Sequence, residues 1–356
     1  MTTIPLGERT DILEKVVDFP SQVAKAYALT KSLSLSLPLV TEISSIVILG
    51  MGGSGIAGDF ARVLLRDSKV PVHVCKSSVP PQFITNTTLV VAITYSGKTN
   101  ETLDALNASL ALGAKGIVIT SSLELESTCN ERQIPCILVP QNNYPRASLG
   151  YLLVPLLGLL QKFHILPSIE RDVSETLSIL EEIKSQCGPE AVYATNPARL
   201  LAIALEEKIP VVYGESNFTD VVALRWKQLF NENSKVHSYI DSFPELLHNE
   251  IEAWQKNAHT SHQHEVMIIL RDTIHEHDTD MGEKIEAARD LIQSTGARVF
   301  EIWSKGKSEL ARLFSLSYMA DFVTIYLALS MGTNPSRIPN IEQLKKKVLT
   351  SLQKQV

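Results

Sequence analysis

Two short stretches of the chain combine glycine and hydroxyl residues in a way that suits the binding of an anion. The first, residues 50–55, reads GMGGSG and directly follows an apolar, β-branched run. Glycine lets backbone N–H groups approach a ligand closely, and a helix that begins there adds a favourable dipole. We therefore expect Gly52, Gly53 and Ser54 to contact the anion. The same letters satisfy the dinucleotide fingerprint G-x-G-x-x-G, but the next predicted strand ends in CKSS at residues 75–78 and lacks the required acid, which disfavours a nicotinamide cofactor.

The second stretch places three hydroxyl groups after the next apolar run, LVVAIT. It reads TYSGKTNET from Thr94 onward. Thr94, Ser96 and Thr99 can each donate a hydrogen bond to a phosphate oxygen, and Thr99 can also cap the following helix. Capping would account for one such hydroxyl but not for three beside a glycine turn. The two stretches together therefore predict a phosphate-binding site.

These stretches belong to a longer alternation of short β-branched runs with amphipathic segments, which is typical of parallel α/β sheets. From Ser45 the predicted strands read SIVILG, VPVHVC, LVVAIT, GIVIT and CILVP. After a linker near residues 163–172, a second series reads IPVVYG, KVHSYI, EVMIIL and ARVFEIW. The pattern and the length of 356 residues predict two α/β domains, 1–165 and 166–356. We expect each to be a doubly wound, flavodoxin-like, mainly parallel sheet flanked by helices.

The two series can be aligned with each other, which indicates an internal duplication. Gly50 matches Gly214 at an offset of about 164 residues, and GAKGIVI at Gly113 matches GARVFEI at Gly296. The offset is larger for the later pair, so the second copy carries extra residues, which we place between residues 243 and 264.

Composition narrows the classes of function. The net charge of −6, with scattered Lys and Arg residues, gives no basic surface for nucleic acid. The N-terminus lacks the layout of a secretory signal, and the longest apolar stretch, Tyr151–Leu160, is too short to span a bilayer and contains Pro155. Four cysteines without CxxC spacing indicate reduced thiols. We expect a cytoplasmic protein without a membrane or nucleic-acid partner.

A group of histidines in the second half raises the question of a metal site. It comprises His259, His262, His264, His275 and His277. None of them forms the helical H-E-x-x-H pattern of a zinc site, and the HEH segment is polar and loop-like after a predicted strand. We expect neither a metal nor any other cofactor.

Six ordered motifs, taken together, resemble the sugar isomerase (SIS) family and, within it, the bifunctional phosphoglucose/phosphomannose isomerases. They are GMGGSGIAGD, TYSGKTNET, PRASLGY, FNENSK, LLHNE and a terminal LK, spread from about Val47 to Lys345. The resemblance implies two stacked SIS domains, a sugar-phosphate substrate and a homodimer. It also implies interconversion of glucose 6-phosphate and fructose 6-phosphate, and of mannose 6-phosphate and fructose 6-phosphate.

The chain departs from the family pattern at some positions. Thr94 stands where serine is usual and keeps the hydroxyl group. In an arm after Met331, NPSR at residues 334–337 stands where the family has a sequence like DPTP, and a threonine there is associated with use of both C2 epimers. Mannose activity therefore rests on the resemblance alone. The arm continues into a short basic helix from about Asn340, and we expect the arm as a whole to pack back onto the body.

The resemblance also implies roles for four side chains. Aldose–ketose isomerisation moves a proton between C1 and C2 through an enediolate, so one carboxylate suffices, and the resemblance assigns this role to Glu232. His248 matches the ring-opening histidine, and Lys345 matches the lysine that assists it. Arg146 matches the arginine that stabilises the enediolate charge. Two further lysines follow Lys345 and are chemically equivalent to it, so the choice within this run stays open.

Two other interpretations remain. A non-catalytic sugar-phosphate sensor would keep the phosphate loops but need not keep Glu232, His248 and Lys345. A different SIS enzyme, acting on an aminosugar or pentose phosphate, would be distinguished by its substrate profile.

Overall fold

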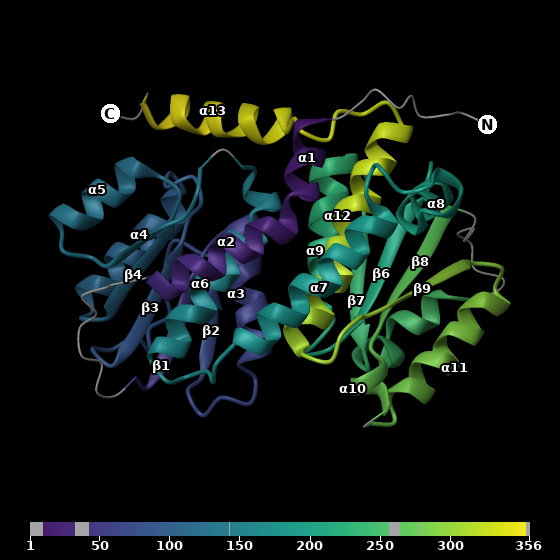
Figure 1. Ribbon diagram of the computed structural model, residues 1–356, viewed down its shortest axis with the longest axis horizontal. Helices are drawn as coiled ribbons and strands as arrows, with labels where there is room; N and C mark the ends of the chain where they lie inside the picture. Colours follow the sequence, from purple (N-terminus) through teal and green to yellow (C-terminus); the bar gives the residue numbers. More distant parts are fainter. Residues whose placement is uncertain (1–9, 33–42, 142, 256–263, 278, 354–356) are drawn as a thin grey trace.

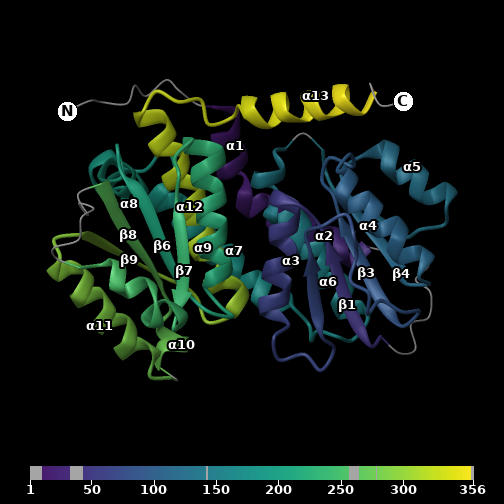
Figure 2. The same ribbon diagram turned by 180° about the vertical axis from the view of Figure 1, so that it is seen from behind.

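The computed structural model of the protein describes residues 10–32, 43–141, 143–255, 264–277 and 279–353. Within them, a five-stranded and a four-stranded sheet lie side by side with helices around them (Figure 1). The view from behind shows the same arrangement, with the last helix, α13, lying across the top of the N-terminal half (Figure 2).

The strands and helices have the following bounds. The strands are β1 (Ser45–Leu49), β2 (Val72–Cys75), β3 (Thr88–Ile93), β4 (Lys115–Thr120), β5 (Cys136–Leu138), β6 (Ile209–Glu215), β7 (Tyr239–Phe243), β8 (Glu265–Arg271) and β9 (Arg298–Trp303). The α-helices are α1 (Asp11–Val17), α2 (Phe19–Ser32), α3 (Gly52–Leu64), α4 (Asn100–Ala111), α5 (Leu123–Glu131), α6 (Leu149–Lys162), α7 (Glu170–Cys187), α8 (Pro197–Ala204), α9 (Asp220–Leu229), α10 (Thr273–His277), α11 (Met281–Ser294), α12 (Glu309–Ser330) and α13 (Pro339–Gln353). Short 3-10 or π turns are η1 (Pro145–Ala147), η2 (Tyr193–Thr195), η3 (Phe230–Ser234), η4 (Glu245–His248) and η5 (Glu250–Ala253).

Neighbouring strands pair in parallel throughout both sheets. The strand order is β2-β1-β3-β4-β5 in the first sheet and β7-β6-β8-β9 in the second, so the second repeats the first four positions of the first. This is the flavodoxin-like order, and the predicted doubly wound α/β fold is confirmed. The predicted duplication agrees with it: Gly113 (φ 88°) and Gly296 (φ 95°) each lead into the fourth strand of their own sheet.

The order of the first sheet determines where a ligand can bind. In doubly wound sheets, ligands bind outside the carboxyl ends of the strands at the point where the order reverses. In the first sheet that point lies between β1 and β3, which are adjacent and completely buried. The loops after these two strands are the glycine-rich and hydroxyl-rich stretches of the sequence.

The long helix α12 packs against α7, α8 and α9 in the second half of the chain, and its side chains belong to a hydrophobic cluster that includes residues of both halves. The two halves meet where α2 packs against α7, α3 against α9 and α1 against α12. Each large apolar side chain buried there contributes roughly 1.5–3 kcal/mol. Among the described helices, α12 alone is long and apolar enough to cross a membrane, but 89% of its apolar window is buried inside the protein, as in a core helix.

Three local expectations need correction. The sequence pattern predicts a helix from about Ile56 to Asp67, but helix α3 begins four residues earlier, at Gly52, so the glycine turn is itself the first helical turn. The HEH segment is not a loop but the short helix α10. The arm packs onto the body as expected at Pro335 and Ser336, whose carbonyls bind Arg146, but the side chains of α13 from Asn340 to Val348 are exposed. His259 and His262 lie outside the described residues.

Candidate active site

The glycine-rich turn presents backbone donors at the carboxyl end of β1. The N–H groups of Ser54 and Gly55 donate to the Met51 carbonyl, at 3.0 and 3.1 Å. Gly52 and Gly53 precede them, at the N-terminal end of α3, where backbone N–H groups have no partner within the helix. Gly52 adopts φ 52°, which favours glycine. Both glycines thus lie at the position where the sequence predicts that an anion binds.

The hydroxyl groups of the second stretch lie beside this turn. The Ser54 hydroxyl accepts a hydrogen bond from the Tyr95 N–H at 3.1 Å, which joins the two loops. The Thr94 hydroxyl, 1% exposed, donates to the Thr99 hydroxyl at 3.4 Å. Ser96 is exposed and accepts from the Lys98 N–H at 3.3 Å. The predicted phosphate residues therefore come together at one edge of the first sheet.

The glycine turn also contacts the segment that carries Arg146. A Cβ atom on Gly53 would lie 2.7 Å from the Pro145 carbonyl and 2.8 Å from the Arg146 nitrogen, closer than real Cβ atoms come to backbone. Only glycine permits this approach. The Tyr95 hydroxyl supports the same segment, because it donates to the Pro140 carbonyl at 2.8 Å and accepts from the Asn143 N–H at 3.2 Å. The phosphate loops and the segment of Arg146 are thus packed directly against each other.

The guanidinium of Arg146 is 3% exposed and has defined partners on several sides. Its Nε donates to the Asn233 side-chain oxygen at 2.8 Å, and its Nη2 donates to the Pro335 and Ser336 carbonyls at 2.7 and 3.1 Å. Its Nη1 lies 3.6 Å from a carboxylate oxygen of Glu232. Arg146 therefore connects the first half of the chain, the Glu232 turn and the C-terminal arm.

A buried ion pair contacts the backbone of Arg146. Arg225 on α9 donates to both carboxylate oxygens of Asp321 on α12, at 2.9 Å each, and its other terminal nitrogen donates to the Arg146 carbonyl at 3.2 Å. Both side chains of the pair are nearly inaccessible to water. A charged pair in such a place fixes geometry more than it adds stability.

Glu232 projects from the π turn η3 at the end of α9. Single π turns in helices often occur at functional sites. Its neighbours are fixed: the Asn233 side chain donates to the Thr324 hydroxyl at 3.0 Å, and the Ser234 hydroxyl donates to the Thr324 carbonyl at 2.6 Å. Lys235 then ends the turn in the left-handed conformation, with φ 59°. The turn thus holds Glu232 beside two fully buried residues.

The electrostatics of Glu232 suit a base that gains and loses a proton. Burial raises the pKa of Glu232, and the charges of Arg146, Arg225, Lys235 and Lys345 lower it, in that order of strength. Burial likewise lowers the pKa of Arg146, although the nearby Glu232 opposes this. A carboxyl group whose pKa lies above its ordinary value is closer to the operating pH, where a general base works best.

A cavity of about 420 Å³ lies beside Glu232. The Glu232 turn and its continuation line one side, and residues 338–341 of the arm line the other. The volume lies within the usual range for small-molecule sites. Lys345, which follows this wall on α13, is among the charges that lower the pKa of Glu232. The phosphate-loop residues are not among the lining residues, and Arg146 lies between the two parts.

His248 is not brought to Glu232 within one chain. Glu232 precedes β7 and His248 follows it, so the five residues of that strand separate them along the sheet. Such a strand is about 16 Å long. In the described part of the chain, no hydrogen bond or ion pair joins His248 to Glu232.

Sequence reasoning missed several residues of this site. Asn233, Lys235 and His237 lie within a few positions of Glu232, but only the fold shows that Asn233 orients Arg146 and that the other two line the cavity. Asp321, buried in α12, carried no sequence signal beyond an acid in an apolar helix. An acid within an apolar helix was thus the one feature of the sequence that could have indicated a role for Asp321.

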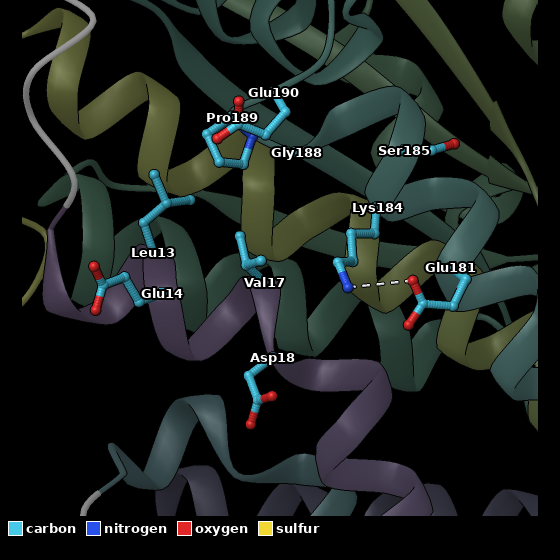
Figure 3. A pocket seen from close by; sticks show the side chains of 10 residues that line it. All are labelled: Leu13, Glu14, Val17, Asp18, Glu181, Lys184, Ser185, Gly188, Pro189 and Glu190. Atoms are coloured by element: carbon cyan, nitrogen blue, oxygen red, sulfur yellow. Dashed lines mark hydrogen bonds and ion pairs between the residues drawn. The ribbon is translucent and has the colours of Figure 1, made fainter.

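A larger cavity of about 590 Å³ lies elsewhere, between α1 and the end of α7 (Figure 3). Its lining includes four carboxylate side chains, from Glu14, Asp18, Glu181 and Glu190, and Lys184, which is 3.2 Å from Glu181. This negative lining disfavours a phosphate, and none of the predicted site residues lines it.

The described residues contain no group of three His, Cys, Asp or Glu side chains arranged to hold a metal ion. His275 is instead engaged by Glu215, whose carboxylate lies 2.8 Å from its Nδ1, and its ring stacks on Phe218.

Comparisons with known proteins agree with this fold. Residues 39–134 match the SIS domain family, and residues 194–348 match the family described as the bacterial phospho-glucose isomerase C-terminal SIS domain. A hypothetical protein of Thermus thermophilus superposes with a TM-score of 0.74 at 15% identity, covering 98% of this chain and 91% of that one, which shows the fold alone.

Two relatives carry the same name. The chain is 36% identical over 342 residues to a bifunctional phosphoglucose/phosphomannose isomerase of Caldicellulosiruptor bescii, covering 95% of this chain and 98% of the relative. It is 33% identical over 305 residues to one of Thermoplasma acidophilum, covering 86% and 90%. The chain belongs to the family of bifunctional phosphoglucose/phosphomannose isomerases.

Proposed function

We propose that this protein is an aldose–ketose isomerase that interconverts glucose 6-phosphate, fructose 6-phosphate and mannose 6-phosphate. The observation that carries the proposal is the position of Arg146. Its segment contacts Gly53 of the phosphate loop on one side, and its guanidinium lies 3.6 Å from the Glu232 carboxylate on the other. The phosphate-binding loop thus lies on one side of the buried Arg146 side chain, and the base, Glu232, lies on the other.

The reaction follows from these positions. The loops after β1 and β3 bind the phosphate, and His248 with Lys345 opens the sugar ring by moving a proton from the C1 hydroxyl to the ring oxygen. The Glu232 carboxylate removes the proton from C2 of the open aldose and returns it to C1, while the hydroxyl proton on O2 passes to O1, which gives the ketose. Arg146 stabilises the negative charge of the intermediate enediolate. No atom or electron enters or leaves overall.

The use of both epimers has a simple chemical basis. The enediolate is planar at C2 and so has no configuration there. Which aldose forms on the return path depends on which face of C2 is presented to Glu232. The names of the relatives support both activities for this chain.

We expect the purified protein to convert fructose 6-phosphate into both glucose 6-phosphate and mannose 6-phosphate. The products are resolved by NMR spectroscopy, with and without a chelator, because the described residues offer no metal cluster. Aminosugar and pentose phosphates serve as comparison substrates. Binding of fructose 6-phosphate without turnover would favour a sensor, and faster turnover of another sugar phosphate would favour a different SIS enzyme.

We also propose that the active protein is a homodimer in which His248 acts in the site of the other subunit. The separation of His248 from Glu232 along β7 supports this, because one chain alone leaves the ring-opening group away from the base. The exposed helix α13 supports it too. Ile341, Leu344 and Val348, at helical spacing, are 40%, 62% and 50% exposed, and a second copy would cover them.

Coexpressed variants test this arrangement. Glu232→Gln and His248→Asn each impair both sites of a homodimer. If His248 acts across the interface, a hybrid dimer has one site with both changes and one with neither. Random pairing should then restore about a quarter of wild-type turnover. No recovery above the two parent variants would contradict cross-subunit action, and a monomer in size-exclusion chromatography would contradict the dimer.

We propose further that the two domains divide near residue 165, between α6 and α7, and that the protein works in the cytoplasm. The four cysteines are free thiols, which suits a reducing compartment.

A further inference from the structure

Lys235 joins two segments of the site that are distant in sequence. Its ammonium group donates to the Glu232 carbonyl at 2.6 Å, to the Asn233 carbonyl at 3.2 Å and to the Asn334 carbonyl at 3.1 Å. The first two carbonyls belong to the π turn that carries the base. The third carbonyl, that of Asn334, belongs to the C-terminal arm and is the first place where the arm is held.

The arm has a second fixed point directly after the first. Arg146 binds the carbonyls of Pro335 and Ser336, the next two residues of the arm. From there the arm forms one wall of the cavity beside Glu232 and continues into α13, which carries Lys345. Lys235 and Arg146 are therefore the two cations that fasten the arm to the turn of the base.

The backbone of Lys235 agrees with a positioning role. The residue adopts φ 59° and ψ 29°, the left-handed conformation that residues other than glycine adopt rarely. This conformation turns the chain back so that the side chain reaches the carbonyls of its own turn. The same conformation follows α5 and α6, at Gln133 and His164, because it is a common way for a helix to end.

We propose that Lys235 is a positioning residue for the isomerase reaction: its ammonium group locks the C-terminal arm against the Glu232 turn, and loss of its proton releases the arm. This inference rests on the proposed function. It adds a residue to which the motifs gave no role, and it links the geometry of the arm to pH.

The number of donors explains why protonation matters. An ammonium group has three N–H donors for the three carbonyls, whereas a neutral amine has two and no charge. Partial burial has the largest effect on the pKa of Lys235 and lowers it, and the charge of Arg146 lowers it further. The charge of Glu232 raises this pKa, and the net result is a pKa of about 8. Among the described residues, His237 also lies in the wall of this cavity, and Arg225 and Lys345 also act on Glu232. We therefore expect the lock to open as the pH rises past the lowered pKa of Lys235.

Three variants of the full-length protein test the proposal: Lys235→Met, Lys235→Arg and the control Lys284→Met. Lys284 lies on α11 and pairs only at the surface with Asp280, at 2.7 Å. The kcat and KM for fructose 6-phosphate are measured from pH 6.5 to 9.5, and thermal melting checks folding. An arginine stays charged across this range, so it separates the charge of residue 235 from its titration.

We expect the kcat of the wild type and of Lys284→Met to fall above about pH 8. Lys235→Met should lose about 10- to 100-fold in kcat at pH 7, since small displacements of reacting groups cost that much, and should show no further fall near pH 8. Its KM should change little, because the phosphate loops are untouched. Lys235→Arg should move the fall in kcat to higher pH. If Lys235→Met does not fold, the result for Lys235→Arg tests the proposal by itself.

Two results would overturn the inference: wild-type kcat in Lys235→Met, or the same alkaline fall near pH 8 in Lys235→Arg as in the wild type. The control variant distinguishes a failure of this inference from a failure of the proposed function. If the wild type and Lys284→Met do not convert fructose 6-phosphate, the proposed function fails; if they do and residue 235 has no effect, only this inference fails.

Discussion

Replacing Glu232 with glutamine should lower kcat for fructose 6-phosphate by about 10²- to 10⁴-fold, the usual contribution of a positioned general base. Glutamine keeps the size and polarity of the side chain but cannot accept the C2 proton. The π turn should stay intact, because Asn233 and Ser234 hold it to Thr324 on α12. The KM should change little, since the phosphate is bound on the other side of Arg146.

The pH profile gives a second measure of the same residue. The Glu232 carboxyl group must be ionised to act as a base, and burial raises its pKa above the ordinary value. In the wild type, kcat/KM should therefore fall as the pH drops through that raised pKa. Glu232→Gln should lack this acid fall. The matched control is Glu283→Gln, an exposed acid on α11, which should behave like the wild type.

Replacing Arg146 with methionine should lower kcat by about 10²- to 10³-fold, as the loss of a preorganised donor to a developing oxyanion does. Methionine fills much of the volume but supplies no donor. The Asn233 oxygen and the two arm carbonyls would lose their partner, which costs about 1–3 kcal/mol in the free energy of unfolding for each group left buried and unpaired. Thermal melting measures this part separately from turnover.

The direction of the pH effect distinguishes the proposed role of Arg146 from simple destabilisation. Arg146 provides the largest of the charges that lower the pKa of Glu232. Without that cation the pKa of Glu232 rises further, so the acid fall in kcat/KM should move to higher pH. Arg132→Met, which removes an exposed arginine bonded to Asn107, is the control. An unchanged acid fall in a folded Arg146→Met protein would contradict the proposed coupling.

The phosphate half of the site could be predicted from the sequence because its determinants are local. The glycine turn and the hydroxyl run are each contiguous, and each follows a β-branched strand. Parallel pairing of β1 and β3 then brings them together by a general rule of doubly wound sheets. The start of α3 was placed four residues late, because three glycines in its first turn hide the helical pattern.

The other half depends on contacts that no local pattern reports. Arg146 and Glu232 lie in different halves of the chain, and only the resemblance paired them. The clamp on the arm involves backbone carbonyls of Asn334, Pro335 and Ser336, which every residue type possesses. For the same reason Lys235 could not be distinguished in the sequence from a surface lysine at a helix end.

The arm itself shows where composition misleads. A helix with Ile341, Leu344 and Val348 at helical spacing suggests packing onto its own body. In the structure these side chains are exposed, whereas the segment before the helix is held by Arg146 and Lys235. The apolar spacing is explained if a second subunit covers it, as we propose.

The measurement that tests the account most directly is turnover of fructose 6-phosphate by the wild type beside Glu232→Gln, with both aldose phosphates resolved by NMR spectroscopy. The account predicts glucose 6-phosphate and mannose 6-phosphate from the wild type, and at least about 10²-fold slower formation of both from the variant. A wild-type protein that forms neither product, or a variant that forms them at the wild-type rate, would contradict it.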